Sequence, residues 1–290
     1  LSNDGSRVAI GCPHSASDRG HVEIYDYSVG SGWSKVGTNI IGATAGEKFG
    51  TSVSLSSNGT QVAIGAPEFS EIGYTNRGRV QVWTYTIGSG WQQTGLNING
   101  DDGGNKFGST VSLSDPFTNG GNDSVLAVGA PGHALNRGQI RVFIYNGSNW
   151  VLRGVPLDGF ATGDEFGTSV DLSKNGLYII GGAPKNDTGG PNAGHTRVFF
   201  YHTASSSWVQ TGPDIFGIVA NERSGTSVSI SNTGTRVAVG SPGNGKGDVK
   251  VYVYENSVWT KLGETIIGTI TNDQFGHSVS LSTNGLRLGV

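Results

Sequence analysis

Residues 49–67 read FGTSVSLSSNGTQVAIGAP, and the pattern that opens this stretch organises the whole chain. The opening pentapeptide occurs five times with small variations, at Phe49, Phe107, Phe166, Ser224 and Phe275. Successive copies are 58, 59, 58 and 51 residues apart. A motif that returns at a nearly constant spacing indicates an internal repeat.

Tryptophan marks the same period independently. The same four intervals separate five of the six tryptophans: Trp33, Trp91, Trp150, Trp208 and Trp259. Periods of this order are typical of propellers and solenoids, in which each repeat buries its faces only against its neighbours. The sequence therefore predicts a repeat architecture over its full length.

Each repeat reads as four short strands. Residues 52–56 alternate small polar with apolar side chains, as a half-buried strand does. An Asn-Gly turn at Asn58 and Gly59 leads into a second strand at 61–65, and two further strands are expected at 78–86 and 91–98. No stretch shows the period of a helix, so the sequence predicts an all-β protein.

Four antiparallel strands repeated around an axis make a blade of a β-propeller. We expect residues 1–290 to form a single β-propeller domain of five repeats, each 51–59 residues long. The second strand occurs a sixth time, because RVAIG at 7–11 is echoed by LRLGV at 286–290. The simplest ring has five blades, one of them closed by the N- and C-terminal segments. Six or seven blades, or part of a tandem array, remain alternatives.

The repeat resembles the FG-GAP repeat of the propeller at the head of integrin α subunits and of related extracellular proteins. The FG pair is kept in four of five repeats, and the GAP element is kept at Gly65, Gly129 and Gly182. It is relaxed to GCP at Gly11 and to GSP at Gly240. The resemblance covers nearly the whole chain, and it implies a propeller located outside the cell or at the cell surface.

The integrin repeats bind Ca²⁺ in an extended loop between the first and second strands, and this chain departs from that pattern. A Ca²⁺ ion needs six to eight oxygen ligands. Most of the corresponding loops are tight turns with few carboxylates, so no cofactor is expected there. The loop at 114–124 is longer and carries Asp115, Asn119 and Asp123, which leaves one Ca²⁺ site as an alternative to a surface insertion.

The composition and charge of the chain argue against two kinds of partner, nucleic acid and the membrane interior. Charged residues make up 14% of the chain and the net charge is −3, with no basic run to follow a phosphate backbone, which argues against nucleic acid. No apolar run approaches the roughly 18 residues that span a bilayer, so direct membrane insertion is not expected. The single cysteine, Cys12, has no partner for an intrachain disulfide.

Two sets of polar residues stand out against the repeat. The position two residues before each FG pair is acidic or amide in every copy, and it holds Glu47, Asn105, Asp164, Glu222 and Asp273. These side chains either form an acidic ring at one mouth of the central channel or accept hydrogen bonds from loop N–H groups, and we favour the second. Asp171 and His277 replace the usual Ser or Thr near the first strand and are candidates to line the channel.

The loops between second and third strands vary most, and binding usually resides in loops on a rigid scaffold. Their mixed charges and rings suit a protein or glycan partner. The candidate ligand-binding residues are His14, Arg19, Tyr74, Arg77, His133 and Arg137.

Four N-x-[ST] sequons are candidate glycosylation sites, at Asn58, Asn122, Asn146 and Asn186. The last three are expected on the surface of the protein. The two-residue turn at Asn58 leaves less room for a glycan.

Two classes of function follow. The main prediction is a non-enzymatic extracellular propeller for scaffolding, adhesion or ligand binding, with neighbouring propellers of the same kind as partners in a tandem or filamentous assembly. The alternative is a carbohydrate-active enzyme or lectin that uses the channel mouth. A glycosidase needs two acids about 5 to 10 Å apart, for which the candidates are Asp171 with Asp164, Glu165 or Glu222.

Overall fold

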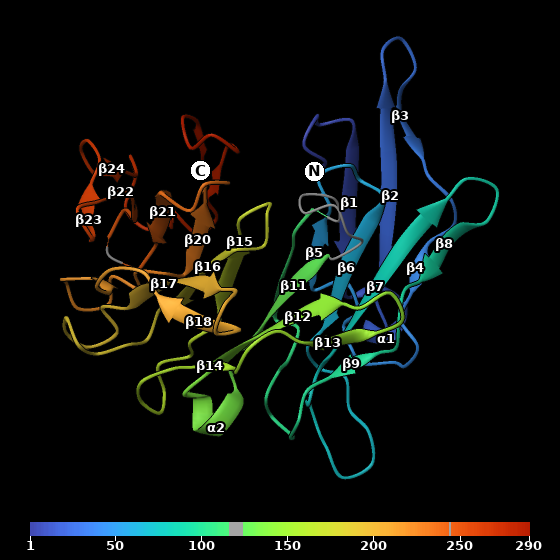
Figure 1. Ribbon diagram of the computed structural model, residues 1–290, viewed down its shortest axis with the longest axis horizontal. Coiled ribbons are helices and arrows are strands. Elements are labelled where there is room, and N and C mark those ends of the chain that lie inside the picture. The colour runs from blue at the N-terminus through green and yellow to red at the C-terminus, as the bar shows by residue number, and fades with distance from the viewer. Residues whose placement is uncertain (116–123, 244) are drawn as a thin grey trace. The chain divides into compact units, whose positions relative to one another are not determined.

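The computed structural model describes residues 1–115, 124–243 and 245–290 (Figure 1). The chain divides into two compact units. Unit 1 comprises Leu1–Ala130 and Val142–Leu152, and unit 2 comprises Pro131–Arg141 and Arg153–Val290. The boundary between them runs through strand β12 (Gln139–Tyr145).

The second repeat shows the arrangement of strands in a sheet. Strands β5 (Ser52–Leu55), β6 (Gln61–Ala66), β7 (Arg79–Thr86) and β8 (Gly90–Gln93) follow one another as antiparallel neighbours. The FG-led strand lies at one edge and the Trp-led strand at the other, as predicted. The expected single strand at 91–98 is instead two pieces, because β9 (Ile98–Asn99) pairs separately with β7 after a turn at Gly95, where φ is +74°.

The remaining sheets repeat this order. In unit 1 they contain β1 (Arg7–Cys12), β2 (His21–Ser28), β3 (Gly32–Lys35), β4 (Ile40–Ile41), β10 (Thr110–Leu113), β11 (Val125–Ala130) and β13 (Trp150–Leu152). In unit 2 they contain β14 (Leu157–Asp158), β15 (Ser169–Leu172), β16 (Tyr178–Ala183), β17 (His195–His202), β18 (Ser207–Gln210), β19 (Ile215–Phe216), β20 (Ser227–Ile230), β21 (Arg236–Ser241), β22 (Asp248–Glu255), β23 (Val258–Lys261) and β24 (Ile266–Ile267).

The described residues contain only two short helices, α1 (Ser15–Asp18) and α2 (His133–Asn136). Both are single turns with positive φ at their inner residues, for example +51° at Ala16 and +58° at Leu135. The predicted all-β class, with four- and five-stranded antiparallel sheets, is confirmed.

The last segment of the chain forms a two-stranded sheet. Strand β25 (Ser280–Leu281) pairs with β26 (Leu288–Gly289), while β1 pairs with β2. The sixth copy of the second strand is β26, and it pairs with β25, the first strand of the same repeat. The count of five blades, the shared closing blade and the single domain stay predictions.

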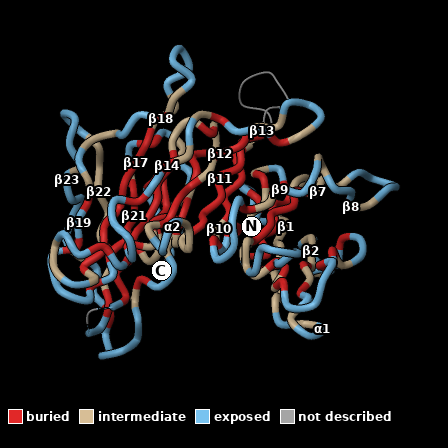
Figure 2. The backbone as a smooth tube through the Cα atoms, turned by 90° about the horizontal axis from the view of Figure 1, so that it is seen from below, coloured by how far each residue is buried: buried red, intermediate tan, exposed pale blue. Residues whose placement is uncertain are grey.

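The aromatic ring of the FG pair is a wedge between neighbouring sheets. Phe49, Phe107 and Phe166 are fully buried. Phe49 belongs to a core cluster that draws Val22 from one sheet and Val62 from the next. Figure 2 shows buried residues concentrated along the strands and exposed residues in the connecting loops. The hydrophobic core therefore lies between successive sheets.

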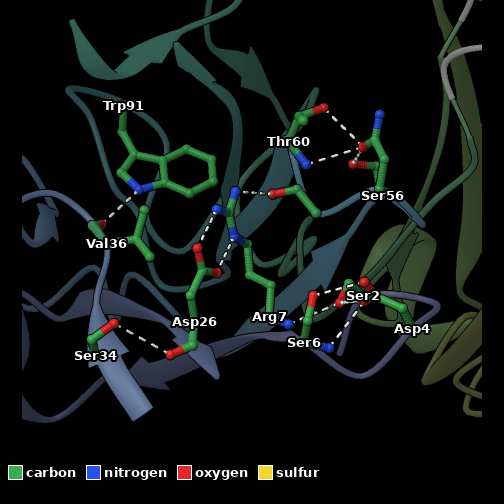
Figure 3. A network of polar contacts seen from close by, with 12 residues as sticks. Ser2, Asp4, Ser6, Arg7, Asp26, Ser34, Val36, Ser56, Thr60 and Trp91 are labelled. Carbon is green, nitrogen blue, oxygen red and sulfur yellow. Dashed lines mark hydrogen bonds and ion pairs between the residues drawn. The ribbon is translucent and has the colours of Figure 1, made fainter. Parts of the chain in front are cut away.

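Side-chain hydrogen bonds also join successive sheets. The indole Nε1 of Trp91 donates to the carbonyl of Val36 at 3.0 Å, and Trp208 does the same to Arg153 at 2.7 Å. Arg7 pairs with Asp26 and also donates through Nη1 to the carbonyl of Gly59 at 2.9 Å (Figure 3). These contacts explain why Trp recurs with the period of the repeat.

One histidine lies inside this core. His195 at the start of β17 has an exposed fraction of 0%, and its ring centroid lies 5.4 Å from that of Phe160 and 5.8 Å from that of Phe216. Both ring nitrogens lack a hydrogen-bond partner. Burial, aided by the charge of Arg197, lowers the pKa of His195 to about 3. The folded protein therefore holds this imidazole in its neutral form.

Mild acid is expected to destabilise the protein through His195. An unfolded histidine takes up its proton near pH 6.5, whereas the folded His195 has a pKa of about 3, so stability falls as the pH drops below about 6.5. Between pH 6 and 5, wild type should lose about 1 kcal/mol more of its free energy of unfolding than His195→Leu does. Urea denaturation at each pH measures this difference, and equal losses in both proteins would contradict it.

Candidate functional site

Tyr74 and Arg77, two of the predicted ligand-binding residues, stabilise their own loop in unit 1. The guanidinium of Arg77 forms an ion pair with Glu71 and donates through Nε to the carbonyl of Gly100 at 2.8 Å. It also lies 4.5 Å from the centre of the Tyr74 ring. Arg77 is therefore committed to internal contacts.

His14 and Arg19 lie in another loop of unit 1. Nδ1 of His14 is 2.9 Å from a carboxylate oxygen of Asp18, and Arg19 is exposed. Among the described residues, no hydrogen bond or ring contact joins this loop to the side chains of Tyr74 or Arg77.

His133 and Arg137 come together in unit 2. Arg137 Nη2 lies 3.2 Å from Asp158 Oδ2, and Gln139 donates to the other oxygen of Asp158 at 2.8 Å. Nε2 of His133 is 3.4 Å from the side-chain nitrogen of Gln139. Arg137 and Gln139 thus share the Asp158 carboxylate, and His133 lies beside Gln139.

The predicted calcium loop falls largely outside the described residues, which exclude Asn119 and Asp123. Asp115 accepts a hydrogen bond from the backbone N–H of Ser57 at 3.1 Å. In the described part of the chain, no group of three or more His, Cys, Asp or Glu residues is arranged to hold a metal ion. The Ca²⁺ site stays a prediction.

The sequons differ in accessibility. Asn58 and Asn146 lie in turns, where their side-chain oxygens accept hydrogen bonds from Thr60 and Ser148 at 3.0 Å. Asn186 is only 3% exposed, and its side-chain nitrogen donates to Asp164 at 2.9 Å. The expected surface position of Asn186 is therefore wrong, because its amide closes a buried loop contact. Asn122 lies outside the described residues.

The recurring carboxylates before each FG pair accept hydrogen bonds from their own loops, as favoured from the sequence. Asp164 accepts from the N–H of Ala161 at 3.0 Å, and Asp273 accepts from Ile270 at 3.1 Å. Glu222 accepts from two loop N–H groups and pairs with Lys250. These acids are structural.

Asp171, a candidate for the channel, also joins two sheets of unit 2. Its Oδ2 accepts hydrogen bonds from Ser229 Oγ at 3.0 Å and from the N–H of Ile230 at 2.9 Å. Lys185 pairs with Glu165 at 2.7 Å. The acids named for a glycosidase pair are thus already engaged in contacts that hold the fold.

The turn at the FG pair follows a rule that one repeat breaks. In four repeats, the Ser or Thr after FG donates its hydroxyl hydrogen to the carbonyl just before FG. The donors are Thr51, Ser109, Thr168 and Thr226, at 2.7, 2.7, 2.7 and 2.8 Å. In the fifth repeat this position is His277, which has no hydroxyl to donate and is exposed. The fifth repeat therefore lacks this side-chain hydrogen bond and carries an exposed imidazole at the same position.

A second departure lies three residues before FG. The first three repeats place Gly46, Gly104 and Gly163 there, with φ of +82°, +74° and +91°. The last two place Asn221 and Asn272 there, with φ of +60° and +71°. Glycine adopts this left-handed backbone without steric cost, whereas asparagine adopts it at some cost. The fourth and fifth repeats therefore carry an amide side chain at a position where glycine would be less strained.

A third difference is an ion pair that two repeats make and the fourth lacks. Lys48, just before an FG pair, bonds Glu68 at 2.8 Å, and Glu165 at the same position bonds Lys185 at 2.7 Å. The matching partner of Arg223 is Gly243. A Cβ at residue 243 would lie only 2.9 Å from Cγ of Arg223, so the arginine stem packs in the space that a side chain at residue 243 would need.

All three departures meet in one pocket of unit 2, with a volume of about 460 Å³. It lies between two successive FG turns and the loop after β21. Its lining residues are Asn221, Arg223, Thr226, Pro242, Gly243, Gly245, Asn272, Gln274 and His277. An imidazole, a guanidinium and three amides converge here, so we take this pocket as the candidate functional site.

Sequence reasoning found one member of this pocket and missed the others. His277 was singled out because it replaces Ser or Thr in the FG motif. Arg223, Asn221 and Asn272 precede the FG position, outside the loops between second and third strands that the sequence predicts as binding loops. Aligning the five repeats on FG reveals the glycine-to-asparagine change from sequence alone.

Comparisons with known proteins identify the architecture. A family model of the FG-GAP repeat matches residues 155–199. No curated protein matches the chain. A Bacteroides uniformis protein described as a 6-phosphogluconolactonase superposes with a TM-score of 0.63 and 15% identity, over 97% of this chain and 74% of its own. The periplasmic gluconolactonase PpgL of Pseudomonas aeruginosa superposes with a TM-score of 0.64 and 15% sequence identity. The match covers 98% of this chain and 74% of that protein.

This likeness shows a β-propeller fold. It also corrects the functional prediction: both similar structures are named as enzymes, which contradicts the main prediction of a non-enzymatic scaffold. That prediction depended on the near-identical repeats, the partial repeat at each end and the absence of a catalytic constellation in the sequence. Among the described residues, no helix is long and apolar enough to span a membrane.

Proposed function

We propose that the protein is a carbohydrate-active enzyme that hydrolyses sugar lactones, with the pocket around His277 as its active site. The observation that carries this proposal is the meeting of His277, Asn221 and Asn272 in one pocket, each in place of the residue that the other repeats use there. The shared fold with two proteins named as lactonases supports the reaction class.

The size and polarity of the pocket suit a sugar derivative. Small-molecule sites commonly measure about 300 to 1,000 Å³, and this pocket measures about 460 Å³. The amides of Asn272 and Gln274 each offer a donor and an acceptor, which match the hydroxyl groups of a sugar. Its described lining residues include no aspartate or glutamate.

Lactone hydrolysis requires a base and a water molecule. In the proposed reaction the imidazole of His277 takes a proton from water, and the oxygen of that water attacks the carbonyl carbon of the lactone. The bond between the carbonyl carbon and the ring oxygen then breaks. The ring oxygen leaves as a hydroxyl after taking the proton from the imidazolium, and the products are a hydroxy acid and the regenerated base.

A lactonase fits the side chains better than a glycosidase does. A glycosidase needs two carboxyl groups free to act as acid and as base or nucleophile. Asp171, Asp164 and Glu222 each accept hydrogen bonds that join loops or sheets. Lactone opening needs no such pair, because the acyl carbon is attacked directly.

We also propose that the enzyme acts outside the cytoplasm. The FG-GAP repeat match and the periplasmic location of the similar Pseudomonas enzyme support this location.

The proposal is tested by following acid release from glucono-1,5-lactone at constant pH, with the protein and without it. The protein should accelerate hydrolysis above the spontaneous rate, with saturation at high lactone concentration. A panel of five- and six-membered sugar lactones, with and without a phosphate group, covers the substrate class. Hydrolysis no faster than in buffer across this panel would overturn the proposal.

A further inference from the structure

We propose that Arg223 makes the pocket an oxyanion-binding site, so that its ligand carries a carboxylate or a phosphate group. The identification of this ligand as a substrate rests on the proposed function, whereas the binding of an oxyanion does not.

Two other repeats place an ion pair at this position. Just before FG, Lys48 and Glu165 each meet a partner of opposite charge on the neighbouring loop, at 2.8 and 2.7 Å. The sign of the pair is reversed between these two repeats. Lys106 and Arg223 instead have Gly132 and Gly243 at the matching loop position, so neither meets an opposite charge there among the described residues.

Among the described residues, Arg223 has no partner of opposite charge. The facing residue is Gly243, and the arginine stem lies against it. The backbone N–H of Arg223 donates to Asn192 and its carbonyl accepts from Thr226, so the main chain is held in place. Its guanidinium forms no hydrogen bond or ion pair with any described residue.

Glu222 and Asp273, which are next in sequence to lining residues, do not line the pocket. Glu222, the preceding residue, pairs with Lys250 and accepts from the N–H groups of Ile218 and Val219. Asp273, on the opposite turn, accepts from Ile270. Because the described lining contains a guanidinium and no carboxylate, the pocket attracts anions.

The surrounding side chains add donors to the charge. The side-chain oxygen of Asn221 accepts from Asn192 at 3.2 Å, which leaves the nitrogen of Asn221 to donate. His277 and Gln274 lie on the facing turn. A planar guanidinium with five N–H donors pairs in bidentate fashion with carboxylate or phosphate, and neighbouring neutral donors complete the coordination of an oxyanion.

The test is a titration followed by NMR at the His277 ring. Inorganic phosphate and gluconate are the two anionic probes, and glucose is the neutral control. We expect a saturable shift with at least one anion and none with glucose at equal concentration. Arg223→Gln should weaken that binding at least tenfold, and Arg223→Lys should retain part of it. Lys261→Gln, which removes a charge on β23, is the matched control and should leave binding unchanged.

Each outcome decides the proposal. Binding of phosphate alone assigns a phosphorylated ligand, and binding of gluconate alone assigns a carboxylate. Binding of neither anion, or equal binding in wild type and a folded Arg223→Gln, overturns it. Anion binding without lactone hydrolysis would reject the proposed function and leave the anion site standing. Circular dichroism of each variant establishes that it is folded.

Discussion

Phe166→Ala is expected to lower the free energy of unfolding by about 3–5 kcal/mol, because truncation of a fully buried phenylalanine leaves a cavity. The ring has an exposed fraction of 0%. It lies 4.2 Å from the guanidinium carbon of Arg197, and its centroid is 6.4 Å from that of His195, so two buried polar groups also lose a contact. Urea denaturation of wild type and variant measures the difference.

The control is the same substitution at Phe160, whose exposed fraction is 57%. Phe160→Ala should cost clearly less than Phe166→Ala, because the Phe160 ring is already largely in contact with water. If Phe166→Ala unfolds at the same urea concentration as wild type, the FG ring is not the wedge that holds neighbouring sheets together.

His277→Thr is expected to abolish most lactone hydrolysis, with a fall in kcat of about 10²–10⁴-fold, the usual contribution of a general base. The substitution restores the residue that Thr226 and Thr168 provide in other repeats. Its hydroxyl should then donate to the carbonyl of Gln274, so stability should stay equal or rise slightly. The kinetics of lactone opening and a thermal melt measure the two effects.

A matched control is His202→Thr, which removes an exposed histidine at the end of β17, outside the pocket. Its kcat should equal that of wild type. Full activity in His277→Thr would show that the imidazole takes no part in the reaction. Lost activity together with a large drop in melting temperature would show instead that the residue acts through the fold.

The sequence prediction of a scaffold was wrong for a physical reason. Residues that recur in every repeat solve the same packing problem, and the structure bears this out for Phe49, Trp91 and Glu47, which form wedges, sheet contacts and loop closures. Asp171 departs from the repeat yet also joins sheets. A residue that differs from the repeat therefore indicates a candidate site only where several such residues line one pocket.

The sequence by itself determined the repeat, the all-β class, the order of strands within each sheet and the role of the FG ring. These features follow from local alternation, turn chemistry and a period that requires each repeat to bury the same faces. The split of the fourth strand and the burial of Asn186 depend on contacts with other segments, and the tertiary structure alone revealed them.

Only the tertiary structure decided which polar residues act together. Arg223 and His277 are 54 positions apart in the numbering, and Gly243 lies between them. His277 stands out in the sequence because it replaces Ser or Thr, whereas Arg223 and Gly243 do not, since charged residues and glycines occur in many of the turns. Their pocket exists because two successive turns at the FG position and one loop pack side by side, with the stem of Arg223 against Gly243. Packing between repeats, which no local pattern encodes, brings these groups together.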